Sequence, residues 1–155
     1  MRYAVGCDHA GYPLKEPLVE ELEARGYEVI DLGTGGFASV DYPAFAERAG
    51  RLVASGGADM GLLICGTGTG MAISANKIDG IRAVSVSESF SARMARAHND
   101  ANVLCLGARV LGPGAAVDVL RAWLAAEFEG GRHQRRVEMM MEIKACLDDQ
   151  AEDET

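Results

Sequence analysis

The chain has 155 residues, of which 48% are hydrophobic, and its formal net charge is −8. This length is enough for one domain with a full core, and the acidic balance argues against nonspecific nucleic-acid binding. No stretch is apolar for long enough to span a bilayer, and none has the shape of a signal peptide. We therefore expect a cytoplasmic protein with no membrane or nucleic-acid partner.

The cysteines and the spacing of possible ligands give no sign of a metal centre. Cys7, Cys65, Cys105 and Cys146 lack the C-x-x-C spacing of zinc sites and redox pairs, and we interpret them as reduced thiols. No pair of histidine or acidic residues has the helical or loop spacing typical of a metal site. The sequence thus predicts neither a metal nor a cofactor.

Short apolar runs alternate with amphipathic segments along the whole chain. We expect strands at residues 2–7, 27–32, 60–65, 81–86 and 101–106. We expect helices from Pro13 to a C-cap at Gly26, from an Asp41 cap to about 55, from Met71 onward, from a Ser87 cap to about 97, over 113–128 and over 133–147. The alternation predicts a three-layer α/β/α, Rossmann-like sandwich with a five-stranded parallel sheet and an extra C-terminal helix.

The C-terminal region is the part of the chain least clearly assigned to this sandwich. We expect a single domain over residues 1–147, whose last helix, at about 133–147, carries Met140, Ile143 and Leu147 on one side. This adaptable apolar stripe suits packing at a subunit interface. Residues 148–155 contain five acids and are expected to be a disordered tail.

The segment from Met60 to Gly70 carries the clearest functional signal. A strand ends at Cys65, the glycine loop Gly66-Thr67-Gly68-Thr69-Gly70 follows, and a helix then begins. Such a loop builds a nest of backbone N–H groups that can bind an anion. Its spacing matches neither the Rossmann fingerprint nor a P-loop. A thiol beside an amide nest suits proton transfer with stabilisation of an oxyanion, although a buried cysteine before a glycine turn is about equally compatible with this segment alone.

Other polar residues follow the predicted strands and converge with this segment. Asp8 and His9, Ser87, and Arg109 all stand at the carboxyl edge of the sheet, where open α/β sheets bind ligands. Taken singly, each is a common turn or surface residue, so only their convergence with Cys65 indicates a site.

His98 and Asn99 precede a strand and therefore belong to the opposite rim of the sheet. Their plainer interpretation is a helix C-terminus whose polar side chains satisfy carbonyl groups. If His98 acts with Cys65, it has to come from a neighbouring subunit. Arg132 and Arg136 are four residues apart on one helix face, which suits a phosphate as well as a solvated basic end.

Taken together, these segments resemble the ribose-5-phosphate isomerase B family, a group of metal-free sugar-phosphate isomerases. The resemblance covers about residues 2–145 and rests on GCDHAGY, DLGT, DYP, GLLICGTGTGM, ANK, GIRA, RAHNDANVLCLGAR and FEGGRHQRRV. Cys65, with Ala rather than an acid at position 75, places the chain in the cysteine-bearing branch.

The resemblance implies a role for each matching residue. Cys65 matches the base that moves a proton through a cis-enediolate, and Asp8 and His98 match residues that open the sugar ring. Thr67 matches a hydroxyl that assists proton movement. The remaining matches are ligands of the substrate or of its enediolate: the amides of Gly66, Gly68, Thr69 and Gly70, and the side chains of His9, Asn99, Arg109, Arg132 and Arg136. Members of the family are homodimers or homotetramers with shared active sites.

The implied reaction is the conversion of ribose 5-phosphate to ribulose 5-phosphate in the pentose phosphate pathway. Three alternatives remain open. The same chemistry could act on a tetrose or hexose phosphate such as erythrulose, allose or galactose phosphate. The glycine loop could serve a non-catalytic sugar-phosphate or nucleotide-binding domain, or Cys65 could be the nucleophile of a hydrolase.

Overall fold

A computed structural model describes residues 1–143 of the chain. Within this range, five parallel strands form one sheet in the order β2-β1-β3-β5-β4. Their bounds are β1 Arg2–Cys7, β2 Glu28–Asp31, β3 Met60–Cys65, β4 Ala83–Ser85 and β5 Val103–Gly107. The predicted parallel sheet is therefore confirmed, with strand ends that shift by one or two residues.

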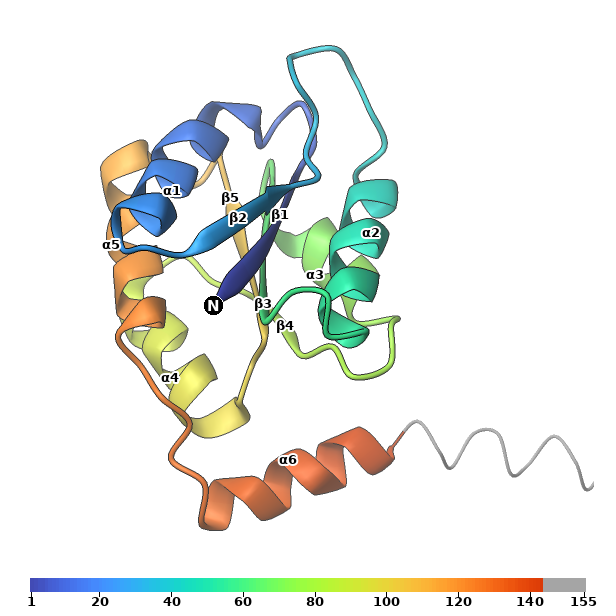
Figure 1. Ribbon diagram of the computed structural model, residues 1–155, viewed down its shortest axis with the longest axis vertical. Coiled ribbons are helices and arrows are strands. Elements are labelled where there is room, and N and C mark those ends of the chain that lie inside the picture. The colour runs from blue at the N-terminus through green and yellow to red at the C-terminus, as the bar shows by residue number, and fades with distance from the viewer. Residues whose placement is uncertain (144–155) are drawn as a thin grey trace, which may run out of the picture.

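Helices cover both faces of the sheet and make the predicted three layers (Figure 1). Figure 1 shows α1, α4 and α5 on one face and α2 and α3 on the other. Their bounds are α1 Tyr12–Ala24, α2 Tyr42–Ala54, α3 Thr69–Ala75, α4 Ser89–Asn99, α5 Pro113–Leu124 and α6 Arg132–Glu142. The expected end of the last helix at 147 and the expected tail at 148–155 lie outside the described residues.

Each face of the sheet has its own apolar core. Alternate residues of the central strands point to opposite faces, so Leu62 and Leu104 pack toward α1, α4 and α5, whereas Leu63 and Cys105 pack toward α2 and α3. In α1, Leu14, Leu18 and Leu22 recur every four residues and form the buried stripe of the helix. Because both faces are covered, the central strands are apolar throughout, as in other parallel sheets.

Of two predicted helix caps, Asp41 is confirmed in position and Ser87 is wrong. Ser87 does not cap α4; the cap is Glu88, whose carboxylate accepts hydrogen bonds from the backbone N–H groups of Phe90 at 2.6 Å and Ser91 at 2.8 Å. Glutamate is less common at this position than serine, which is why the sequence pattern pointed one residue too early. Asp41 does precede α2, but its side chain makes no capping hydrogen bond.

The chain path places a crevice at the carboxyl edge of the sheet. From β1, the chain moves outward to β2 and then returns across β1 to β3, so the connections after β1 and β3 diverge. Ligands of open α/β sheets bind where neighbouring connections diverge in this way. The residues that follow β1 and β3 are Asp8 and Gly66, which are two of the predicted site residues.

Helix α6 stands apart from the sandwich, beyond the edge of the sheet where the strands begin (Figure 1). It packs mainly against α4, buries His133 and Val137, and leaves Met139 and Met140 exposed. None of the helices in residues 1–143 has the length and hydropathy that a bilayer-spanning helix needs.

Candidate active site

Parallel pairing of β1 with β3 brings Asp8 beside Cys65. The register joins Cys7 to Ile64, and the Asp8 N–H continues the ladder by donating to the Ile64 carbonyl at 3.2 Å. The Asp8 carboxylate is buried and accepts a hydrogen bond from the Gly11 N–H at 2.8 Å. Gly11 has no room for a side chain, because a Cβ atom there would collide with the Ile64 carbonyl. The first turn is thus held tightly against the strand that carries the thiol.

The glycine loop wraps around the sulfur of Cys65. The Gly68 N–H points at Cys65 Sγ, with nitrogen and sulfur 3.1 Å apart. Gly68 has a φ of +79°, and a Cβ atom there would lie 2.8 Å from Ser85 Oγ and 3.1 Å from the Cys105 backbone. Glycine is therefore required both by the left-handed conformation and by the close approach. The sulfur of Cys65 is thus in hydrogen-bond contact with a backbone N–H group of the glycine loop.

The turn after β5 completes this side of the site. The Ala108 N–H donates to the Cys65 carbonyl at 2.9 Å, and the Arg109 N–H donates to the Gly66 carbonyl at 3.0 Å. These two bonds lay the turn along the glycine loop and bring the Arg109 side chain close to Gly66. Gly107 permits this contact, since a Cβ atom there would lie 2.6 Å from Thr67 Cα. Sequence analysis did not single out Gly107.

These segments enclose a pocket of about 340 Å³. Within it, the exposed Tyr42 ring from the start of α2 faces Gly70, and the Val40 N–H donates to His9 Nδ1 at 3.2 Å. Because Nδ1 accepts this bond, the neutral ring carries its proton on Nε2, where it can be donated. The lining residues are Asp8, His9, Ala10, Tyr42, Cys65, Gly66, Thr67, Gly70 and Arg109.

Three cysteines are described, and only Cys65 lines this pocket. Burial raises the pKa of Cys7 to about 11, with Lys15 acting weakly in the other direction. Burial also raises the pKa of Cys105, and the neighbouring Cys65 adds to that increase. Both of these thiols are therefore protonated near neutral pH and serve as core residues, which leaves Cys65 as the thiol with access to a ligand.

The structure separates the predicted site residues into two groups. Asp8, His9 and Arg109 join Cys65, Gly66, Thr67 and Gly70 at the pocket, with Gly68 and Thr69 in the same loop. His98 and Asn99 lie at the end of α4, and Arg132 and Arg136 are exposed on α6. None of these four lines the pocket of its own chain. Ser87, which we expected at the crevice, does not line it either.

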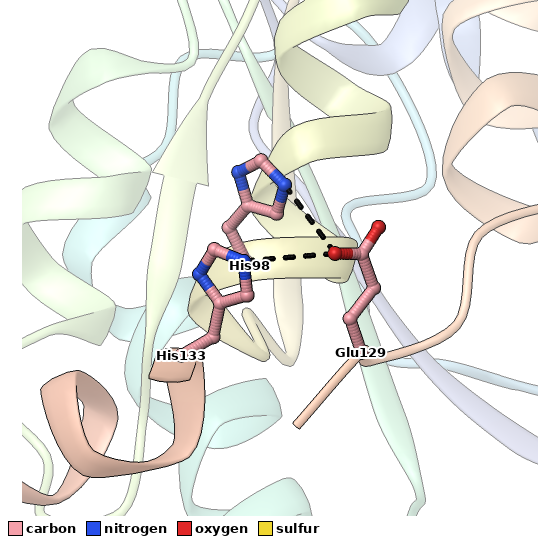
Figure 2. Close-up of side chains that lie close together, drawn as sticks. All are labelled: His98, Glu129 and His133. Atoms are coloured by element: carbon pink, nitrogen blue, oxygen red, sulfur yellow. Dashed lines mark ion pairs between the residues drawn. The ribbon is translucent and has the colours of Figure 1, made fainter. Parts of the chain in front are cut away.

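The second group has a contact that the sequence did not predict (Figure 2). The imidazoles of His98 and His133 are stacked, with ring centroids 4.1 Å apart, and the carboxylate of Glu129 lies against both rings. Burial lowers the pKa of His133, and the positive charges of His98 and Arg132 act in the same direction. Glu129 and His133 are four residues apart, but Gly130 and Gly131 between them argue against a continuous helix, and His98 is brought in by the fold.

A parallel α/β sheet with a thiol and an anion-binding glycine loop at its switch point defines a small-molecule enzyme of the α/β class. The profile of the family described as Ribose/Galactose Isomerase matches residues 3–140. The chain belongs to this family, which confirms the resemblance noted from the sequence segments.

Named relatives and solved structures agree with that assignment. Ribose-5-phosphate isomerase B of Escherichia coli is 51% identical over 92% of this chain and 96% of its own length. D-erythrulose-4-phosphate isomerase of Pectobacterium atrosepticum is 42% identical over 87% of this chain and 90% of its own length.

Among solved structures, ribose-5-phosphate isomerase B of Clostridium thermocellum is 51% identical over 95% of this chain and 99% of that one, with a TM-score of 0.93. The Mycoplasma genitalium protein of the same name, solved with bound ribulose 5-phosphate, is 38% identical over 99% of this chain and 97% of that one, with a TM-score of 0.87.

Proposed function

We propose that the protein is a metal-independent aldose–ketose isomerase that converts ribose 5-phosphate to ribulose 5-phosphate. The observation that carries this proposal is the Cys65 thiol in the lining of a pocket, with the Gly68 N–H on its sulfur, in a member of the isomerase family. Aldose–ketose exchange needs one base that serves two adjacent carbons, together with donors for the enediolate oxygens.

Cys65 is the proposed base of the proton transfer. The thiolate takes the proton from C2 of the open aldose and returns it to C1 of the ketose, and the two oxygens exchange a proton in between. Thr67, which lines the pocket, is the proposed carrier of that proton. Backbone amides of Gly66 to Gly70 hold the negative charge of the enediolate, and one such donor is worth roughly 10²–10³-fold in rate.

Sugar phosphates are mostly cyclic, so the ring has to open before the proton moves. Asp8 and His98 are the proposed residues for this step, with His98 as the donor to the ring oxygen. His9 and Arg109 are the phosphate ligands within one chain, because both present N–H donors to the pocket.

We further propose that the active site is shared between two subunits of a homodimer, or of a homotetramer built from such dimers. His98, Asn99, Arg132 and Arg136 match family site residues but do not line the pocket of their own chain. On α6, the arginines lie close to Met139 and Met140, which are exposed apolar residues of the kind that interfaces cover. A partner subunit that covers this helix would receive the four polar side chains at its own pocket.

A four- or six-carbon sugar phosphate is the main alternative substrate. Relatives of similar identity bear the names of erythrulose-4-phosphate and galactose-6-phosphate isomerases. Tyr42 at the pocket mouth is placed to contact the sugar, but its presence alone does not select a chain length. A non-catalytic binding domain or a cysteine hydrolase would not explain why Asp8 and Arg109 lie beside Cys65.

The first experiment compares kcat/KM for ribose 5-phosphate, erythrulose 4-phosphate, allose 6-phosphate and galactose 6-phosphate, with EDTA present throughout. We expect ribose 5-phosphate to give the highest value and EDTA to have no effect. A higher value for another sugar would reassign the substrate but keep the chemistry. Loss of activity in EDTA, restored by a divalent ion, would overturn metal independence, and no turnover of any sugar would favour a binding domain.

The second experiment tests the role of Cys65. Cys65→Ala is expected to lower kcat by at least about 10²-fold, the lower range for loss of a general base, while ribulose 5-phosphate still binds with nearly unchanged affinity. Cys7→Ala is the matched control, because Cys7 is a buried thiol on the other face of the sheet. Near-normal turnover of Cys65→Ala would contradict the assignment.

A further inference from the structure

The contact between His98, Glu129 and His133 places three metal-ligating side chains at one point (Figure 2). His98 Nε2 lies 3.7 Å from Glu129 Oε2, and His133 Nε2 lies 3.6 Å from the same oxygen. One ligand atom of each residue lies within 4.8 Å of the other two. Ligands of a tetrahedral zinc ion, with bonds near 2.0–2.2 Å, are roughly 3.3 Å apart, so small movements would bring these atoms to coordination distance.

Backbone hydrogen bonds fix the segments that carry the three residues. The Glu129 N–H donates to the Ala97 carbonyl at 3.0 Å, which joins the loop before α6 to the last turn of α4. Gly130 and Gly131 then turn the chain with φ values of +63° and +57°, and the His133 N–H donates to the Gly130 carbonyl at 3.0 Å. Because backbone hydrogen bonds fix the segments that carry these residues, little ordering would be needed for an ion to bind.

Within a single chain, one side of the cluster is accessible from solvent. His133 is buried beneath the other two residues, whereas the side chains of His98 and Glu129 are 36% and 56% exposed. The two rings are nearly parallel, at 6°, so a turn of the half-exposed His98 ring about its Cβ–Cγ bond is required to aim both nitrogens at one ion. The exposed side leaves the fourth position to water, as in open zinc sites.

We infer that His98, Glu129 and His133 form a binding site for a single divalent transition-metal ion of the zinc type. Two imidazole nitrogens and one carboxylate oxygen are the donor set of known three-residue zinc sites, and imidazole favours zinc, copper and nickel over magnesium or calcium. Within one chain, none of these three residues lines the Cys65 pocket, whereas in the proposed dimer His98 belongs to the active site of the partner subunit.

Metal binding here is inhibitory, a consequence that rests on the proposed function. An ion on His98 occupies the nitrogen lone pair and takes the place of the proton that the ring-opening step uses. The isomerase therefore works without a metal and is slowed by one. A chelator would reverse the inhibition, because removal of the ion leaves all three side chains chemically unchanged.

Histidine NMR can test the site directly, because the chain contains only three histidines. Zinc chloride is titrated into Cys65→Ser, which removes the pocket thiol as a competing ligand, and the imidazole ring nitrogens are followed. We expect one zinc ion per chain and coordination shifts at His98 and His133, with His9 as the unshifted internal reference. Shifts at His9 alone, or at no histidine, would overturn the site.

Two glutamate variants in the same background give a matched comparison. Glu129→Gln is expected to weaken zinc binding at least tenfold, whereas Glu127→Gln, a nearby exposed carboxylate outside the cluster, is expected to leave it unchanged. Equal affinity in the two variants would remove Glu129 from the site and contradict the proposal.

Activity assays then separate the site from its inhibitory role. With native Cys65 in place, zinc should inhibit isomerisation and EDTA should restore it, and Glu129→Gln should need at least tenfold more zinc for half-inhibition. Equal inhibition of both proteins would place the inhibitory ion elsewhere and overturn this role. If no sugar phosphate is turned over, the proposed function fails, yet the NMR titration still decides whether the metal site exists.

Discussion

At the scale of single residues, the site depends on glycines that allow backbone segments to touch. Gly11 lets the Asp8 turn lie on β3, Gly68 lets an amide reach the Cys65 sulfur, and Gly107 lets the turn after β5 lie on Thr67. These contacts fix the donors before substrate arrives, and donors held in place cost no reorganisation during the reaction.

Gly107→Ala tests this dependence. Its Cβ atom would lie 2.6 Å from Thr67 Cα and 2.9 Å from the Gly66 carbonyl oxygen, so the loop has to move. We expect a loss of about 1–3 kcal/mol in the free energy of unfolding and at least about a tenfold loss in kcat/KM, because displacement of catalytic groups by 1 Å can cost about 10²-fold.

Gly112→Ala is the control for that variant, since a Cβ atom at Gly112 has no neighbour within 4 Å. Urea unfolding and steady-state kinetics on both variants decide the question. Wild-type kinetics for Gly107→Ala would show that the loop tolerates displacement and that its close contacts do not matter for catalysis.

At the scale of elements, one carboxylate joins two helices on the same face of the sheet. Glu21 of α1 accepts hydrogen bonds from Arg121 of α5 at 2.9 and 3.0 Å and from Arg25 at 2.6 Å. These bonds, above all those from Arg121, lower the pKa of Glu21 to about 2 from its ordinary value of 4.5. The link stabilises the contact of α1 with α5 only while the carboxylate is charged.

The pH dependence of this link follows from the lowered pKa. The folded state releases the Glu21 proton more readily than the unfolded chain, so the stabilisation is complete above pH 4.5 and is lost as pH falls toward about 2. We expect Glu21→Gln to lower the free energy of unfolding by about 1 kcal/mol at neutral pH, a modest value because both arginines are largely exposed.

Urea titrations at neutral pH and at about pH 3 measure this effect against Glu20→Gln, an exposed neighbour on α1. The difference between wild type and Glu21→Gln should shrink in acid. A difference in unfolding free energy that stays constant with pH would show that Glu21 stabilises the fold through packing and not through its charge.

At the scale of the whole molecule, the two groups of polar residues lie at opposite edges of the sheet. Cys65 follows a strand and His98 precedes one, and parallel strands carry these positions at opposite ends. Helix α6 lies beyond the edge of the sheet where the strands begin (Figure 1), and Arg132 and Arg136 are exposed on it. A second subunit is the simplest means of joining the two groups.

Mixed subunits test the shared site. Cys65→Ala and His98→Ala are each expected to be nearly inactive alone. After they are unfolded together and refolded at equal amounts, half of the dimers are mixed and each has one intact site, which predicts about a quarter of wild-type activity for a two-fold symmetric dimer. No recovery, with mixed dimers verified by mass spectrometry, would show that Cys65 and His98 do not act in one site across the interface.

The sequence by itself determined the sheet, its helices and the pocket side of the candidate site. Strands such as Met60–Cys65 and the stripe of Leu14, Leu18 and Leu22 are readable because apolar spacing is a local property. Asp8, Cys65 and Arg109 could be grouped because the carboxyl ends of parallel strands share one edge. The cap of α4 was misplaced, since Ser87 and Glu88 are adjacent and only the folded backbone selects between them.

Only the tertiary structure decided which distant residues touch. The order of β4 and β5, the fit of Gly107 against Thr67, and the contact of His98 with Glu129 and His133 all join residues across loops and layers. No periodicity in the chain records such contacts, because they depend on strand order and on close packing between elements. For this reason Cys65 could be proposed as the base from sequence, whereas the histidine–glutamate cluster could not.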